Sequence, residues 1–306
     1  MTTDLAVSIA AKRAIADGVV ELTLAPLDGA PLPPWEPGAH VDLILENDLV
    51  RQYSLCGDGR LAVLLEEAGR GGSAYVHKRL NAGDVVRIRG PRNNFRLHQA
   101  PEYVFLAGGI GITPILPMVH YAANSGAKWH LYYGGRTLAA MAFRDELARY
   151  GENVTYLPQD IYGLPDLEAI LSPVECGIYC CGPAPMLDAV AEVCGRLGKK
   201  DLHVERFTPR AEERTEADRP ITVQLDQSGQ TIQVPPGTSI LQAVRDAGIS
   251  ALSSCGEGTC GTCETAVLKG IPEHRDSVLD EIERETGDCM MICVSRAKTD
   301  TLVLDL

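Results

Sequence analysis

The sequence lacks an excess of positive charge, a long apolar run and a secretory leader. Its 306 residues hold 28 Lys and Arg against 41 Asp and Glu, a formal net charge of −13. So acidic a chain is poorly suited to bind nucleic acid or an anionic membrane surface. The uncharged stretch 103–127 is broken by Gly, Pro and polar residues, so no apolar run of about 18 residues remains to span a membrane. The N-terminus has neither the basic nor the apolar region of a signal peptide, which predicts a cytoplasmic protein.

Cysteine, by contrast, is plentiful. Ten cysteines without a secretory signal indicate a reducing compartment and thiols used for metal binding rather than disulfides. Cys255, Cys260 and Cys263 have the spacing C-x4-C-x2-C, and Cys293 follows 30 residues later. This is the plant-type pattern of a [2Fe–2S] cluster, and the intervening glycines let the backbone wrap the cluster. The alternatives are a zinc site or a disulfide set, although zinc sites more often use paired C-x2-C. On spacing alone, Cys289 could replace Cys293 as the fourth ligand.

Changes of rhythm along the chain predict three domains. Residues 1–100 show short alternating stretches punctuated by Gly and Pro, typical of an antiparallel β-barrel. Residues 101–207 alternate apolar strands with helical stretches, which indicates an α/β domain with a parallel sheet. Residues 208–220 carry seven charges and no large apolar side chain, so we expect an exposed linker. The strand rhythm returns in residues 221–306, around the cysteine loop.

Two motifs in the barrel region suggest a phosphate and a planar ring as ligands. In residues 51–55, an Arg can pair with a phosphate, a Tyr can lie against a ring and a Ser can meet ring nitrogens. In residues 70–73, a Gly-Gly turn opens a predicted helix, which is typical of an anion site. Residues 70–96 hold seven basic side chains against one acidic one, a local positive field. The alternative is an ordinary strand and a capped helix. The candidate residues are Arg51, Gln52, Tyr53, Ser54, Leu55, Arg70, Gly71, Gly72 and Ser73.

Glycine-rich turns follow three strands of the α/β region, at the sheet edge where ligands bind. The turn at 108–114 lets a pyrophosphate approach the backbone and a helix N-terminus, but it is not G-x-G-x-x-G, so no Rossmann dehydrogenase fingerprint is present. The thiol of Cys181 could abut a nicotinamide, whereas Cys180 points to the other face and is expected in the core. The candidate residues are Gly109, Gly111, Thr113, Gly135, Arg136, Cys181, Gly182, Pro183 and Met186.

Together these motifs make the whole chain resemble the phthalate dioxygenase reductase family of Rieske oxygenase reductases, including its vanillate O-demethylase reductase-like members. The resemblance rests on residues 51–55, 70–73, 108–114 and 181–186 and on the cysteine loop. It implies a flavin barrel, an NAD domain and a C-terminal plant-type ferredoxin domain of β-grasp-like α+β fold. It also implies that Cys293, followed by Val-Ser-Arg, is the fourth cluster ligand and that Cys289 is a bystander.

The resemblance assigns roles to several candidate residues. Arg51 and Ser73 would bind the FMN phosphate, and Tyr53 and Ser54 would contact the isoalloxazine and ribityl groups. Gly109, Gly111 and Thr113 would lie under the nicotinamide nucleotide and the flavin edge. Cys181 would face the site of hydride transfer, and Phe207 would cover the flavin, with a core position at the end of the linker as its alternative. The predicted catalytic residues are therefore Ser54, Thr113, Cys181 and Phe207.

The implied function is the reductase component of a two-component Rieske oxygenase system of aromatic catabolism. NADH would give a hydride to FMN, and single electrons would pass through the cluster to the oxygenase. FMN rather than FAD follows from the family's domain order. The lack of a second cation after Arg136 favours NADH, but Arg136 alone leaves NADPH open as the alternative. Residues 220–306 hold 13 acidic and six basic side chains, so 6 − 13 gives −7, and we expect a monomer that docks transiently and electrostatically on its partner. The alternative is a flavin and iron–sulfur relay subunit permanently bound to another oxidoreductase.

Overall fold

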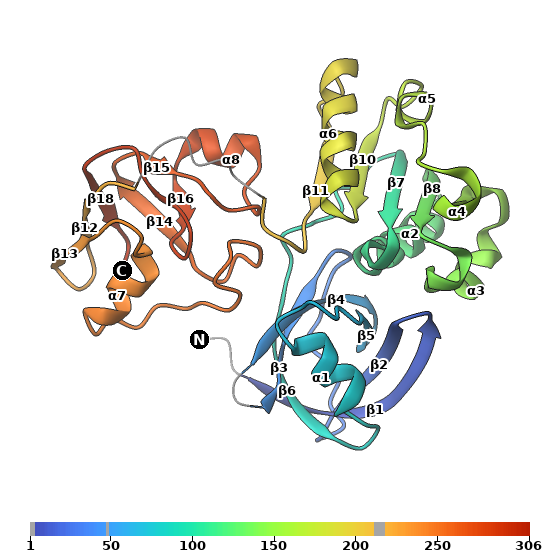
Figure 1. Ribbon diagram of the computed structural model, residues 1–306, viewed down its shortest axis with the longest axis horizontal. Helices are drawn as coiled ribbons and strands as arrows, with labels where there is room; N and C mark the ends of the chain where they lie inside the picture. The colour runs from blue at the N-terminus through green and yellow to red at the C-terminus, as the bar shows by residue number, and fades with distance from the viewer. Residues whose placement is uncertain (1–3, 47–48, 211–217) are drawn as a thin grey trace. The chain divides into compact units, whose positions relative to one another are not determined.

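The computed structural model describes residues 4–46, 49–210 and 218–306. The chain divides into two compact units, residues 1–206 and 207–306 (Figure 1). The first unit contains a β-barrel and a parallel sheet with helices, and the second contains the cysteine loop. In the part of the chain that the structure describes, no helix is long and apolar enough to cross a membrane.

The N-terminal strands form a closed antiparallel barrel, as the alternating pattern predicts. The neighbours around the barrel are β1, β2, β5, β4, β3 and β6. Alternate side chains point inward, so Val7, Ile9 and Leu22 are fully buried in its core. The strands are β1 (Leu5–Ala16), β2 (Val19–Pro26), β3 (His40–Ile44), β4 (Val50–Gly57), β5 (Arg60–Leu64) and β6 (Val85–Arg92), with helix α1 (Gly72–Lys78) between the last two.

The middle of the chain forms a five-stranded parallel sheet in the order β11-β10-β7-β8-β9. Its strands are β7 (Glu102–Gly108), β8 (Lys128–Gly135), β9 (Val154–Pro158), β10 (Gly177–Cys181) and β11 (Leu202–Glu205). Its helices are α2 (Ile112–Ser125), α3 (Arg144–Leu147), α4 (Gln159–Tyr162), α5 (Leu167–Leu171) and α6 (Ala184–Leu197). Helix α2 packs with Phe105 and Cys181 on one face, and α6 packs with Leu106 and Cys180 on the other. Cys180 therefore lies in the core, on the face opposite Cys181.

An ion-pair network joins the barrel to the parallel sheet within the first unit. Arg60 of β5 donates to Glu21 of β2 and to Glu146 of α3, each at 2.7 Å. The side chain of Glu21 is 2 % exposed, so its charge depends for compensation on Arg60 and on Arg13, which lies 2.5 Å from its other oxygen. His120 of α2 lies 3.3 Å from the same Glu146 carboxylate. The relative position of the two substructures is thus fixed by charge as well as by apolar packing.

The second unit is built on a mixed sheet in the order β13-β12-β18-β14-β16. The strands are β12 (Ile221–Leu225), β13 (Gln230–Val234), β14 (Glu264–Lys269), β16 (Cys289–Met291) and β18 (Thr301–Leu304), with a separate pair β15 (Pro272–Glu273) and β17 (Arg296–Ala297). Helix α7 (Ile240–Asp246) is capped by Ser239 and buries Ile240 and Val244 against the sheet. Helix α8 (Glu281–Thr286) starts with a capping box formed by Asp280 and Glu283. This arrangement fits the predicted β-grasp-like domain.

Candidate active site

The four predicted cluster ligands come together in the second unit. The thiol of Cys255 contacts those of Cys260 and Cys293, and the thiol of Cys263 also contacts that of Cys293. The first three lie in a loop between α7 and β14, and Cys293 follows β16. Cys260, Cys263 and Cys293 are buried and Cys255 is half-buried. Segments separated by 30 residues therefore present four sulfur atoms to one place.

The backbone of the loop supplies the donors that a sulfur cluster requires. The N–H groups of Glu257 and Thr259 donate to Sγ of Cys255 at 3.3 and 3.5 Å. Gly258 has φ +69°, and a Cβ there would lie 2.6 Å from a side-chain carbon of Val294, so glycine is required for conformation and for space. Hydrogen bonds from the thiols of Cys260 and Cys293 hold the pKa of Cys255 well below its usual range.

This donor set fits a [2Fe–2S] cluster. A [2Fe–2S] cluster divides four thiolates between two irons, and four cysteine thiols meet here. Cys289 lies in β16 instead, where burial and the nearby carboxylates of Glu264 and Glu283 raise the pKa of its thiol to about 11.

The two barrel motifs lie side by side. The guanidinium of Arg51 donates to the carbonyl of Arg70 at 2.8 Å. A Cβ at Gly72 would lie 2.4 Å from Cγ of Arg51, so only glycine lets α1 begin against this side chain. Gly71 has φ +85° at the start of the same helix. The hydroxyl of Ser73 accepts from the N–H of Glu66 at 3.0 Å. The strand motif and the Gly-Gly turn thus form one cationic cradle.

The residues of β4 that are predicted to contact a ring lie next to a buried carboxylate that the sequence did not reveal. Ser54 is buried and is paired with His40 across β3 and β4. Burial raises the pKa of Tyr53 to about 12 in spite of the charge of Arg51, so the phenol stays neutral at physiological pH. Gln52 donates at 2.7 Å to Asp42, which is fully buried and also accepts from Arg92 at 2.6 Å. Leu55 is buried in the barrel core.

The glycine turns of β7 and β10 touch each other through their backbones. A Cβ at Gly111 would lie 2.2 Å from the carbonyl oxygen of Cys181. A Cβ at Gly108 would lie 2.6 Å from Sδ of Met186 and 2.7 Å from Cδ of Pro183. Gly182 completes the contact, because its own Cβ would meet Gly108 at 3.1 Å. Glycine at these positions permits close approach of two turns at the carboxyl end of the sheet.

The other predicted nucleotide residues have local structural contacts as well. The hydroxyl of Thr113, 2 % exposed, donates to the carbonyl of Ile110 at 2.9 Å. Gly109, with φ +54°, accepts from the hydroxyl of Tyr133 at 3.2 Å. Gly135 gives room to Met141, whose Cγ would lie 2.4 Å from an added Cβ. Arg136 is exposed at the end of β8.

Glu205 is a candidate that the sequence reasoning missed. It ends β11 in register with Cys181 of β10, at the ligand edge of the sheet. Its Oε2 atom is buried without a hydrogen-bond partner among the described residues, and burial raises the pKa of the carboxyl to about 8. Burial also raises the pKa of Cys181, with the charge of Glu205 adding to it, so the thiol stays protonated. The sequence did contain a signal for Glu205, because an acidic residue at the end of a strand, beside the predicted nicotinamide position, could have been noticed.

Phe207 begins the second unit with its side chain 42 % exposed, and its place over a flavin stays a prediction.

The fold and these sites define an oxidoreductase that joins a nucleotide-binding unit to an iron–sulfur domain. Residues 105–161 match the family model described as oxidoreductase NAD-binding domain, and residues 223–298 match that of the 2Fe-2S iron-sulfur cluster binding domain. The chain is 39 % identical to the phthalate 4,5-dioxygenase oxygenase reductase subunit of Pseudomonas putida, covering 97 % of this chain and 95 % of the relative.

Two solved structures are also similar to the whole chain. A structure of phthalate dioxygenase reductase matches with a TM-score of 0.70 at 37 % identity, over 99 % of this chain and 98 % of its own. An intact type IV self-sufficient cytochrome P450 monooxygenase matches with a TM-score of 0.93 at 40 % identity, over 99 % of this chain but 41 % of that protein. The chain belongs to the phthalate dioxygenase reductase family. The predicted family, three-part fold, oxidoreductase class, NAD-binding domain and [2Fe–2S] domain are therefore confirmed.

Proposed function

We propose that this oxygenase-system reductase serves a two-component Rieske non-heme iron oxygenase and carries electrons from NADH through FMN and the [2Fe–2S] cluster. The observation that carries the proposal is the backbone contact between Gly111 and Cys181. This contact joins the turns after β7 and β10 at the carboxyl end of the sheet, where the nucleotide is expected to bind. It lies in the same unit as the cationic cradle of Arg51 and Gly72. A hydride donor and a flavin can therefore be held by one compact unit. The similarity to the oxygenase reductase subunit of Pseudomonas putida supports the acceptor class.

In the first unit, the role of the side chains is to bind and orient the flavin and the nicotinamide nucleotide, and not to transfer protons. When bound, FMN would take up a hydride and release electrons one at a time, and the cluster would carry them singly. Arg51 and the N–H groups of residues 72–73 provide the positive end of the cradle for a phosphate. Tyr53 remains a neutral phenol beside it. The protonated thiol of Cys181 offers a small, uncharged surface at the predicted hydride site.

NADH rather than NADPH is supported by an acidic neighbour of Arg136. The N–H of Asp160 donates to the carbonyl of Arg136 at 3.1 Å, so the backbone of an acidic residue lies beside that of Arg136 after the end of β8. A 2′-phosphate placed there would meet this negative charge as well as the cation of Arg136. We expect NADH to reduce the protein faster than NADPH does. The variant Asp160→Asn should bring the two reduction rates closer together.

The decisive experiment is an anaerobic titration of the purified chain with NADH, followed by absorbance and EPR. Bleaching of a flavin band together with the signal of a reduced [2Fe–2S] cluster is the expected result. A chain that binds no flavin would overturn the proposal. The reduced protein is then mixed with a terminal Rieske oxygenase and, separately, with a cytochrome P450. Faster reoxidation by the P450 would contradict the Rieske assignment. A P450 is a real alternative acceptor because the chain also matches 41 % of the self-sufficient cytochrome P450 monooxygenase.

Docking on the oxygenase is proposed to be transient and electrostatic. Residues 220–306 have a formal charge of −7, from six basic and 13 acidic side chains. Steering between such a surface and a basic partner face weakens as salt screens it. Electron delivery should therefore slow as the salt concentration rises, with the internal reduction of the flavin unchanged. A delivery rate that is independent of salt, or a stable complex on gel filtration, would favour the permanently bound relay subunit.

A further inference from the structure

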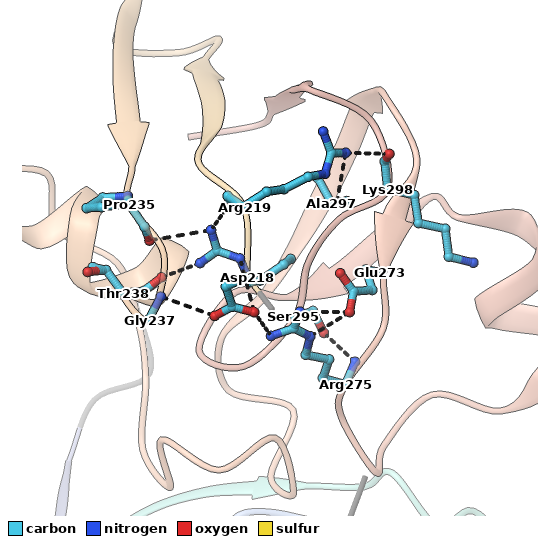
Figure 2. A network of polar contacts seen from close by, with 11 residues as sticks. Asp218, Arg219, Pro235, Gly237, Thr238, Glu273, Arg275, Ser295, Ala297 and Lys298 are labelled. Carbon is cyan, nitrogen blue, oxygen red and sulfur yellow. Dashed lines mark hydrogen bonds and ion pairs between the residues drawn. The ribbon is translucent and has the colours of Figure 1, made fainter. Parts of the chain in front are cut away.

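Asp218 is an acidic residue of the predicted linker, yet its side chain is only 8 % exposed. Its carboxylate accepts from Nη1 of Arg275 at 2.8 Å and from the backbone N–H of Gly237 at 3.2 Å (Figure 2). Nε of Arg296 lies 3.9 Å away from the same oxygen that binds Arg275. The prediction of an exposed linker is therefore wrong at this residue. One carboxylate lies between two guanidinium groups.

Both guanidinium groups are themselves almost fully buried. The side chains of Arg275 and Arg296 are 11 % and 4 % exposed. Arg296 also donates to the backbone carbonyls of Arg219 at 2.8 Å and Thr238 at 2.5 Å, and Arg275 binds Glu273 at 2.7 Å. The backbone carbonyls that bind Arg296 carry no net charge. Buried cations need an anion close by, and Asp218 is an anion that the two arginines share.

Each arginine lies in a segment that is part of the cluster site or contacts it. Arg296 follows Cys293 by three residues and holds that segment to Thr238, next to the start of α7. The backbone N–H of Arg275 donates to the hydroxyl of Ser295 at 3.1 Å, which adds a second hold on the same segment (Figure 2). Two residues after Arg275, the N–H of Ser277 donates to the carbonyl of Gly258 in the cysteine loop at 2.8 Å. One of the two segments held by Asp218 therefore contains the fourth ligand, and the other contacts the loop that carries the first three.

We propose that Asp218 is a positioning residue of the [2Fe–2S] site, which fixes segments 275–277 and 293–296 by pairing with Arg275 and Arg296. It does not touch the cluster; it acts through the loop and the fourth ligand. The inference needs the [2Fe–2S] domain but neither NADH, nor the flavin, nor the identity of the electron acceptor.

The test compares Asp218→Asn with a matched control in the full-length holoprotein. Asp300→Asn also removes one carboxylate bound to one arginine of this unit, but Asp300 is 92 % exposed and its partner is Arg219. Release of the cluster to an iron chelator is followed by visible absorbance, and the dithionite-reduced cluster is examined by EPR. Neither readout depends on NADH or on an oxygenase. Asp218→Asn should release the cluster about tenfold faster, the factor that about 1.4 kcal/mol represents, with altered g-values, while Asp300→Asn matches the wild type.

A merely structural role would lower the melting temperature without changing the EPR spectrum of the protein that remains folded. Asp218→Glu keeps the charge and should restore most of the wild-type spectrum. If Asp218→Asn does not accumulate, Arg275→Gln removes the same contact from the other side and should also speed cluster release. Unchanged g-values and a release rate equal to that of Asp300→Asn, in either variant, would overturn the proposal.

Discussion

Replacing Gly111 by alanine tests whether the contact between the two glycine turns controls hydride delivery. The added Cβ would lie 2.2 Å from the carbonyl oxygen of Cys181, where contacts below 3.0 Å essentially never occur. The two turns must therefore separate by at least 0.8 Å, from 3.0 − 2.2. The backbone of Gly111 has φ −61°, which alanine adopts without strain. The effect thus comes from contact alone and not from backbone conformation.

A displacement of this size acts where the nicotinamide should meet the flavin. Misplacing reacting groups by about 1 Å can cost about 10²-fold in rate, while overpacking a close contact costs about 1–3 kcal/mol of stability. We expect Gly111→Ala to fold, with a lower melting temperature, and to be reduced by NADH about 10²-fold more slowly. Anaerobic stopped-flow absorbance at saturating NADH measures this step directly, apart from binding.

Gly195→Ala provides the matched control within the same unit. Among the described residues no atom lies within 4 Å of a Cβ at Gly195, which is inside α6. Alanine there should leave the reduction rate unchanged and raise helix stability by up to about 1 kcal/mol. If Gly111→Ala were reduced at the wild-type rate, the contact between the turns would have no part in hydride transfer. A loss confined to the apparent affinity for NADH would assign the contact to binding instead.

Three further predictions concern other parts of the protein. Cys293→Ser should abolish the EPR signal of the reduced cluster and Cys289→Ser should preserve it; the reverse would exchange their roles. Burial raises the pKa of Glu205 to about 8, so the native state favours the protonated carboxyl. The contribution of this group to the free energy of unfolding is therefore highest at low pH and falls as the pH rises towards 8, by up to about 1.4 kcal/mol per pH unit. Glu205→Gln should flatten the melting temperature between about pH 5 and pH 8, and an unchanged slope would contradict this. Arg60→Met should lower the free energy of unfolding, measured by chemical denaturation, by about 3 kcal/mol, because Arg60 joins the barrel to Glu146. If the effects of Arg60→Met and Glu146→Gln were additive in the double variant, the two residues would not be coupled.

The sequence predicted what depends on local pattern. Alternation along residues 1–100 was enough for an antiparallel barrel, and the change of rhythm after it was enough for a parallel sheet. The spacing of the cysteines was enough for the [2Fe–2S] domain. In each case the information lies within a few neighbouring residues, because side-chain period and ligand spacing are properties of a continuous segment.

Buried charges could not be predicted in the same way. Asp42 reads as a polar residue in a strand, yet it is fully buried because Arg92, 50 positions later, pairs with it from the neighbouring strand β6. Asp218 lies in the stretch 208–220, which carries seven charges, and was expected to be exposed. Its environment depends on Arg275 and Arg296, which lie 57 and 78 positions later in the sequence. Composition records how many charges a segment has but not which of them find a partner.

The glycines show why the reductase site contains so little conventional acid–base chemistry. Gly258 and Gly71 adopt positive φ, so they shape loops, whereas Gly72 and Gly111 are needed because another segment occupies the space of a Cβ. Both uses bring backbone close to something else, either a second turn or a bound group. A protein whose cofactors perform the electron transfer needs precise placement more than reactive side chains. Substitutions at these contact glycines should therefore impair electron flow more than substitutions of most charged residues at the same edge of the sheet.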